Sequence, residues 1–189
     1  MVRPRTFVEE EVVRSAMMTF WRLGYDATTY RELQKITGLG LRSLSNAFGE
    51  KDELFATVLQ AYRTMMKGTL DNFLDGADLE GLAQFFEMIA AAPESDDDIR
   101  REGCLMVNSV FEINNMADPI ADEVHAYRAM FIEKFSDVLN RANIEDVETK
   151  AEYLLGSLWG IFSQIRLARD PVAARPMATI LANIVRSWK

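Results

Sequence analysis

Apolar residues recur at helical spacing along almost the whole 189-residue chain. The first stripe contains Val12, Val13, Ala16, Met17, Phe20 and Trp21. Such i, i+3, i+4 spacing is typical of an amphipathic helix, and we find no convincing run of alternating β-branched residues bounded by hairpin turns. The pattern therefore predicts an all-α fold of about nine helices. They are expected at about residues 9–23, 29–37, 41–48, 50–74, 79–92, 103–116, 119–142, 144–169 and 173–188.

Glycine, threonine and proline residues mark the ends of these helices. Gly24 ends the first helix, and either Thr28 or Thr29 is a suitable N-cap for the second, with Glu32 at capping-box distance from Thr29. Gly38 and Gly49 end the second and third helices. Proline follows aspartate at 118–119 and 170–171, which suits the first turn of a helix. The intervening sequence ESDDD, at 94–98, is expected to form a solvated loop.

The net charge of -8 is unevenly distributed along the chain. Residues 1–52 contain eight Lys or Arg and seven Asp or Glu, whereas residues 53–189 contain 13 and 22. The acidity therefore resides in the C-terminal part, and the N-terminal part is free to face a polyanion.

Several classes of protein are disfavoured by what the sequence lacks. No apolar run approaches the roughly 18 residues of a membrane span, and the N-terminus has no apolar signal-peptide region, so we expect a cytoplasmic protein without a membrane partner. One cysteine, Cys104, and one histidine, His125, leave no internal disulfide or zinc cluster. No P-loop, nucleophile elbow or HExxH motif is present, and we expect neither enzymatic activity nor a cofactor. Paired carboxylates leave an enzyme as the open alternative.

Residues 29–48 have the form of a helix-turn-helix, since two short segments separated by a glycine turn follow a first helix. The second segment would lie in the DNA major groove. Leu41, Leu44 and Phe48 are expected to bury one face of it. The side chains expected to face the bases are Arg42, Ser43, Ser45 and Asn46. Arginine can pair with guanine and asparagine with adenine, while serine can bind either a base or a phosphate.

The stretch GYDATTYRELQKITGLGLRSLSNAFGEKDELFATVL, at 24–59, resembles the TetR/AcrR family of transcription regulators. The resemblance is strong over about the first 60 residues and looser in the order of later helices. Gly40 stands where the family usually has serine, Ser45 where it has tyrosine, and Gln34 where it has alanine. Because that tyrosine often touches a phosphate, Ser45 predicts a shifted or weaker docking.

The resemblance implies phosphate contacts by Thr29, Arg31 and Lys51. Lys51 also lies in the first turn of a helix, whose dipole favours a phosphate. Arg3 and Arg5 could reach a flanking phosphate or the minor groove. For Arg3, Arg5 and Arg31, a solvated surface charge is an equally good interpretation.

A helix-turn-helix of this size makes few contacts, so we expect a homodimer on a two-fold operator. The resemblance implies that the last two helices form the interface. The interface residues we select are Leu155, Leu158, Trp159, Phe162 and Leu181. The alternative is that these residues only fill the protomer's own core.

The C-terminal part is rich in methionine and aromatic residues, which can line an adaptable apolar cavity. The pocket residues we select are Met66, Phe73, Phe86, Met106, Phe111, Tyr127, Met130 and Phe131. Ordinary helical core remains the alternative for each. Cys104 follows a glycine at an expected helix start, which would lower the pKa of its thiol, although a buried small apolar role is the more common one.

Taken together, the sequence predicts a helix-turn-helix DNA-binding domain at 1–50 and a helical ligand-binding and dimerisation domain at 51–189. The expected function is a regulator, in the first instance a repressor, that binds duplex operator DNA and is released by an unknown small apolar or amphipathic effector. The alternative is a constitutive DNA-binding or protein-interaction module without a small ligand.

Overall fold

The computed structural model describes residues 5–113, 115 and 117–188, with side chains from residue 9 onward. This part of the chain forms nine α-helices and two short 3-10 helices, and none of it forms a strand. The expected all-α fold is thereby confirmed. The bounds are α1 Arg5–Leu23, α2 Tyr30–Thr37, α3 Leu41–Phe48, α4 Lys51–Leu74, α5 Leu79–Ile89, η1 Ile99–Glu102, α6 Leu105–Glu112, α7 Asp118–Arg141, α8 Val147–Ala168, η2 Pro171–Ala174 and α9 Arg175–Ser187.

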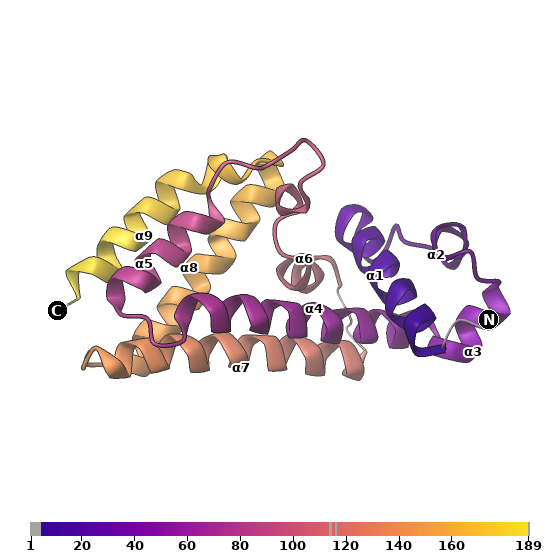
Figure 1. Ribbon diagram of the computed structural model, residues 1–189, viewed down its shortest axis with the longest axis horizontal. Coiled ribbons are helices and arrows are strands. Elements are labelled where there is room, and N and C mark those ends of the chain that lie inside the picture. The colour runs from indigo at the N-terminus through magenta and orange to yellow at the C-terminus, as the bar shows by residue number, and fades with distance from the viewer. Residues whose placement is uncertain (1–4, 114, 116, 189) are drawn as a thin grey trace.

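The molecule is elongated, with a three-helix head at one end (Figure 1). Helices α1, α2 and α3 form this head, and α4 runs from it into the body alongside α7. Helices α5, α8 and α9 complete the body, and α9 packs mainly on α5. The short α6 lies at the junction between head and body, beside α4. No described helix combines the length and the apolar character that a bilayer span requires.

The capping signals act as expected in the head. The Glu32 backbone N–H donates to Thr29 Oγ1 at 3.3 Å, and the Thr29 backbone N–H donates to Glu32 Oε2 at 2.8 Å, which completes the capping box of α2. Gly38 then ends α2 in the left-handed conformation, with φ of 70°. A second capping box, between Glu50 and Glu53, starts α4 and was not predicted.

The expected helix at 103–116 is shorter than the sequence suggested. Gly103 has φ of 70°, and a Cβ there would lie 2.8 Å from the Phe162 carbonyl oxygen, so the chain turns sharply at this residue. α6 starts only at Leu105 and ends at Glu112, while Met116 lies outside the described residues. Similarly, the proline at 171 starts η2, and α9 begins after it.

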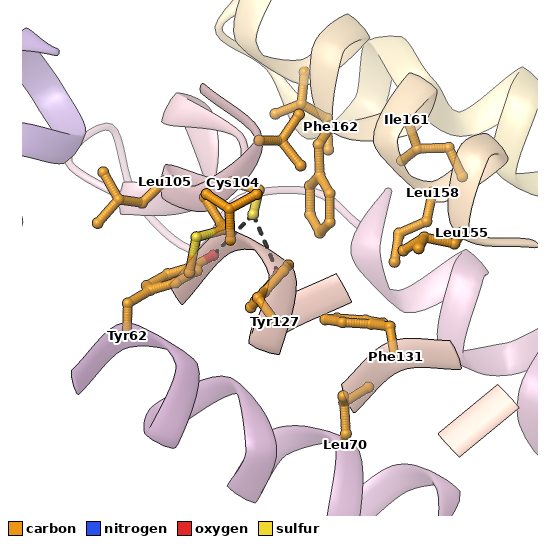
Figure 2. Close-up of a cluster of buried hydrophobic side chains, with 14 of the residues drawn as sticks. Tyr62, Leu70, Cys104, Leu105, Tyr127, Phe131, Leu155, Leu158, Ile161 and Phe162 are labelled. Atoms are coloured by element: carbon orange, nitrogen blue, oxygen red, sulfur yellow. Dashed lines mark hydrogen bonds between the residues drawn. The ribbon is translucent and has the colours of Figure 1, made fainter. Parts of the chain in front are cut away.

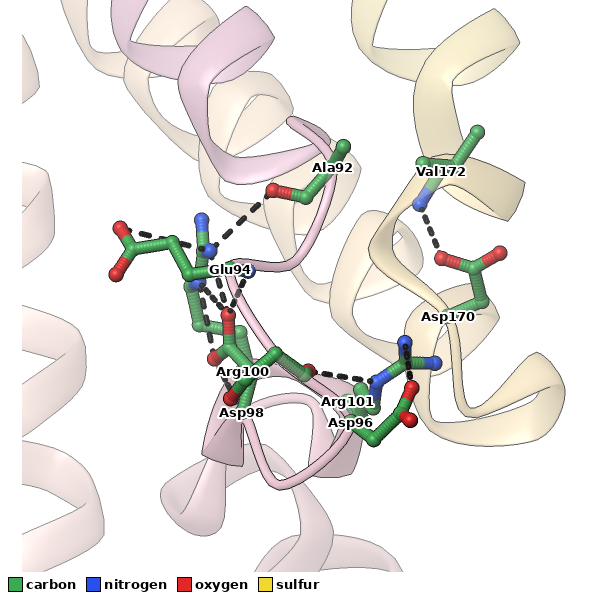
Figure 3. Close-up of polar contacts among 9 residues, drawn as sticks. Ala92, Glu94, Asp96, Asp98, Arg100, Arg101, Asp170 and Val172 are labelled. Carbon is green, nitrogen blue, oxygen red and sulfur yellow. Dashed lines mark hydrogen bonds and ion pairs between the residues drawn. The ribbon is translucent and has the colours of Figure 1, made fainter.

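The acidic loop at 94–98 is held in place by two arginines (Figure 3). Arg100 binds Asp98 at 2.5 Å, and this bonding holds the pKa of the Asp98 carboxyl well below its usual range. Arg101 lies 3.6 Å from Asp96 and donates to the Ser95 carbonyl at 3.4 Å. The loop is therefore organised by local ion pairs, although its carboxylates at 96 and 97 remain exposed.

The core of the body surrounds a small polar cluster (Figure 2). Cys104 is fully buried, and its Sγ lies 3.3 Å from the Tyr62 hydroxyl and 3.2 Å from that of Tyr127. Burial raises the pKa of the Cys104 thiol. Of the two interpretations of Cys104, the more common one, a small buried side chain, therefore agrees with the structure, because desolvation outweighs the effect of the helix N-terminus.

Candidate nucleic-acid interface

The third helix is held to the head by a narrow apolar face. Leu44 is completely buried and Phe48 is half-buried, as expected. Leu41, in contrast, is 48% exposed, so its predicted burial is wrong. α3 is only eight residues long and packs against α2 and α4, which leaves its first turn uncovered.

The polar face of α3 is fully available to a partner. The side chains of Arg42, Ser43, Ser45 and Asn46 are all exposed. Within the described part of the chain, no side-chain hydrogen bond or ion pair engages any of the four. The structure thus brings together one guanidinium, one carboxamide and two hydroxyls along a single helix, which are the groups that bind base edges and phosphates.

Two basic residues lie in the first turns of α2 and α4. Lys51 is the first residue of α4, and its Nζ lies 4.0 Å from the centroid of the Tyr25 ring. Partial burial lowers the pKa of Lys51, and the nearby Asp26 and Asp52 oppose that shift. Arg31, in the first turn of α2, is exposed.

Three further residues, Thr29, Arg3 and Arg5, were predicted to contact DNA. Thr29 is exposed, and its hydroxyl already donates to Glu32 Oε2 at 2.5 Å as part of the cap. Arg3 lies outside the described residues. Arg5 begins α1, but its side chain lies outside the described part as well.

Four charged residues at the junction of head and body carry no sequence motif and were missed. Glu102 is buried and pairs with Arg166 and Arg169 of α8. Arg166 also lies 3.8 Å from Glu112, whose Oε2 accepts the backbone N–H of Tyr25 at 3.0 Å. Since the partners are up to 87 residues apart, only their places in the fold could reveal them.

The predicted dimer residues are mostly core residues of the protomer. Leu155, Leu158, Phe162 and Leu181 are 1 to 8% exposed, so within the protomer they fill its own core, which was the alternative interpretation. α8 packs against α6 and α7, and α9 packs against α5, which consumes these apolar stripes. Trp159 is partly exposed, and its indole N–H is buried without a partner among the described residues.

A different apolar surface is left open on the same two helices, and we call it the α8/α9 face. Gly160 of α8 and Met177 of α9 adjoin, because a Cβ on the glycine would lie 2.6 Å from the methionine methyl carbon. The members of this face are Tyr153, Gly156, Gly160, Leu167, Met177 and Ile180. Ile180 is 62% exposed, although it is a large apolar side chain.

The eight predicted pocket residues are divided between core and surface. Phe86, Met106, Tyr127 and Phe131 are buried, and Met66 and Met130 are partly exposed. Phe73 and Phe111 are 46% and 70% exposed, so neither lines an enclosed pocket of the protomer. Three hollows of about 580, 590 and 360 Å³ open at the surface of the described residues, and none of the eight lines them. No described group of three His, Cys, Asp or Glu residues could hold a metal.

Comparison with known proteins agrees with this arrangement. No family model matches the chain. The chain is 27% identical to the HTH-type transcriptional repressor ComR of Escherichia coli K12, over 98% of this chain and 91% of ComR. It is also 38% identical to the HTH-type repressor BdcR of the same organism, over 60 residues that cover 32% of this chain and 30% of BdcR.

Solved structures with the same fold include two regulators. A cysteine variant of the TetR family regulator CifR, in complex with a 26-base-pair operator duplex, superposes with a TM-score of 0.80 at 25% identity, over 99% of this chain and all of that one. The reduced form of Escherichia coli NemR superposes with a TM-score of 0.81 at 15% identity, over 93% of this chain and 95% of that one. These similar proteins are regulators rather than enzymes, and over almost its whole length the chain resembles the TetR family of transcriptional regulators.

Proposed function

We propose that the chain represses transcription as a homodimer on a palindromic operator, and that a small apolar or amphipathic effector releases it. The observation that carries the DNA contact is the set of exposed, unengaged side chains on α3, namely Arg42, Ser43, Ser45 and Asn46. Residues 1–50 serve as the DNA-binding domain and residues 51–189 as the dimerisation and effector domain. Repression follows the two curated relatives, both of which are repressors.

Lys51, Arg31 and Thr29 are proposed to bind the phosphates beside the groove. Lys51 and Thr29 lie at helix N-termini, where backbone N–H groups and the helix dipole favour an anion. Arg31 is exposed within one turn of Thr29. Arg3 and Arg5 are proposed to extend this contact along the flanking backbone.

The α8/α9 face is proposed as the dimer interface. Apolar side chains on an otherwise charged surface favour burial against a second copy, and the glycines at 156 and 160 allow close helix approach. The buried indole N–H of Trp159 also lacks an acceptor among the described residues, and a partner helix could supply one. Ile180→Glu should therefore yield a monomer in sedimentation. Met65→Glu is the control, since Met65 is similarly exposed, at 47%, but lies on α4.

Effector binding is proposed for the interior around Tyr62, Cys104 and Tyr127. This cluster places hydroxyl and thiol groups among buried apolar side chains, which suits an amphipathic ligand. The constitutive DNA binder remains the second candidate, because the core there is tightly packed and the three hollows open elsewhere. A compound that raises the melting temperature and weakens DNA binding would decide for the effector.

The decisive experiment is selection of random duplex DNA by the purified protein, followed by salt titration of the selected duplex. We expect a two-fold palindrome whose affinity falls steeply with salt. Arg42→Ala should relax one base position in each half-site, whereas Lys51→Ala should weaken all sequences alike. Failure to enrich any sequence at low salt would refute the proposal.

A further inference from the structure

The structure assigns Glu112, the last residue of α6, a positioning role for Lys51. This inference rests on the proposed phosphate contact of Lys51. Glu112 ends α6, at the junction of head and body, and lies outside the helix-turn-helix. It acts through Tyr25, whose backbone it binds and whose ring supports the lysine.

The first step is the contact between Glu112 and the turn after α1. The Tyr25 backbone N–H donates to Glu112 Oε2 at 3.0 Å. Gly24, which precedes it, has φ of 86°, and a Cβ there would lie 2.5 Å from the same oxygen. The carboxylate thus occupies space that only a glycine leaves open.

The carboxylate is itself held by the body of the molecule. Arg166 of α8 lies 3.8 Å from Glu112 Oε1 and donates to the Trp21 carbonyl at 3.4 Å. The Trp21 indole N–H in turn donates to the Gly103 carbonyl at 3.2 Å. The end of α1 and the following turn are therefore docked on α6, α8 and the residues before α6.

The second step runs through the Tyr25 side chain to the DNA-facing end of α4. Its hydroxyl donates to the Asp52 carboxylate, and its ring packs on Phe55 with centroids 4.9 Å apart. The Lys51 Nζ atom lies over the Tyr25 ring, 4.0 Å from the ring centroid. A cation at this distance is attracted to the ring face, so the position of Tyr25 limits where the ammonium group can lie.

The test is a double-mutant cycle of Glu112→Ala and Lys51→Ala, measured as operator affinity across a salt series. Glu112→Ala should weaken binding about as much as Lys51→Ala, and each variant should reduce the salt slope by about one, because each loses the same lysine–phosphate contact. In the Lys51→Ala background, Glu112→Ala should have no further effect. Glu112→Gln should recover most of the affinity, because its amide oxygen still accepts the Tyr25 N–H.

Glu80→Ala is the matched control, since Glu80 is a body carboxylate that pairs with Arg186 far from the head. Its operator affinity should equal that of the unaltered protein. Additive losses in the cycle, or a Glu112→Ala loss without a change in salt slope, would overturn the positioning role while leaving the lysine contact intact. A Lys51→Ala variant with normal affinity and slope would instead remove the contact on which the inference rests.

A separate observation, the exposure of Leu41, points to a specificity-determining residue. Leu41 is 48% exposed at the first turn of α3, one residue before Arg42 and four before Ser45. Residues four apart share one helix face, and the short Ser45 side chain leaves Leu41 uncovered. We infer that Leu41 contacts the 5-methyl group of a thymine, the one apolar group on a major-groove edge.

Replacement of single thymines by uracil in the selected operator removes only that methyl group. At one thymine position in each half-site, we expect this replacement to weaken binding about fourfold, which is the effect on affinity of losing one buried methyl group. Leu41→Ala should bind both duplexes equally, while Leu23→Ala, at a leucine of similar exposure (49%) at the end of α1, should keep the full discrimination. Equal binding of thymine and uracil operators by the unaltered protein would overturn this inference alone. Failure to select any operator would overturn it together with the proposed function.

Discussion

Removing Arg166 should destabilise the protein far more than removing Arg169, although both bind the same carboxylate. The Glu102 side chain is only 6% exposed and lies between the two guanidinium groups. The Arg166 side chain is 26% exposed, whereas that of Arg169 is 62% exposed. The two pairs therefore differ mainly in how far solvent screens them.

The magnitudes follow from that difference. Loss of one partner from a buried pair costs about 3 to 5 kcal/mol, and the remaining Arg169 should reduce this to about 2 to 3 kcal/mol for Arg166→Ala. An exposed pair contributes about 0 to 1 kcal/mol, which is the loss expected for Arg169→Ala. For a chain of 189 residues these values correspond to about 4 to 12 °C and at most about 4 °C in melting temperature.

The assay is urea unfolding at a fixed protein concentration, since dimerisation makes apparent stability depend on concentration. Glu102→Gln in the Arg166→Ala background should recover part of the loss, because the unpaired buried charge is then gone. Equal losses for the two arginine variants, or a loss below about 1 kcal/mol for Arg166→Ala, would refute the reasoning from burial.

Three further predictions concern the buried cluster around Cys104 and the turn after α1, which contains Gly24. Burial raises the pKa values of Cys104, Tyr62 and Tyr127 above their ordinary 9.0, 10.0 and 10.0. Each of these groups therefore stays protonated in the folded protein. The free energy of unfolding should be constant below pH 9 and should fall above pH 9 by about 1.4 kcal/mol per pH unit for each group that ionises in the unfolded chain. Urea titrations between pH 8 and 11 test this slope. The native Cys104 thiol should resist iodoacetamide at pH 8 and react only on unfolding, as mass spectrometry would detect. Gly24→Ala should lower stability by at least about 1 kcal/mol, because a left-handed conformation costs alanine that much and its Cβ would meet Glu112; calorimetry against Gly76→Ala, which meets no neighbour, separates the two effects.

Much of the head could be predicted from the sequence because its signals are local. Thr29 and Glu32 form the predicted capping box, and Gly38 and Gly49 end their helices with positive φ. Leu44 is buried, and the polar residues around it are exposed. The caps and helix ends depend on residues within four positions of one another, and the spacing of polar and apolar residues along α3 is local in the same way.

The body was predicted less well because burial there depends on distant helices. Leu155, Leu158, Phe162 and Leu181 form an apolar stripe that suits either a core or an interface, and periodicity does not distinguish them. Phe111 was predicted to line the effector pocket, yet it is 70% exposed near the end of α6.

Most of the helices, the cap of α2 and the polar face of α3 follow from the amino-acid sequence alone, since backbone geometry and capping depend on near neighbours. Only the tertiary structure decided that Leu41 faces solvent, that Glu102 is buried between two arginines of α8, and that Cys104 lies between two tyrosines. The physical reason is that desolvation depends on which elements cover a side chain. That information arises only when segments far apart in the chain, such as α4 and α7, pack together.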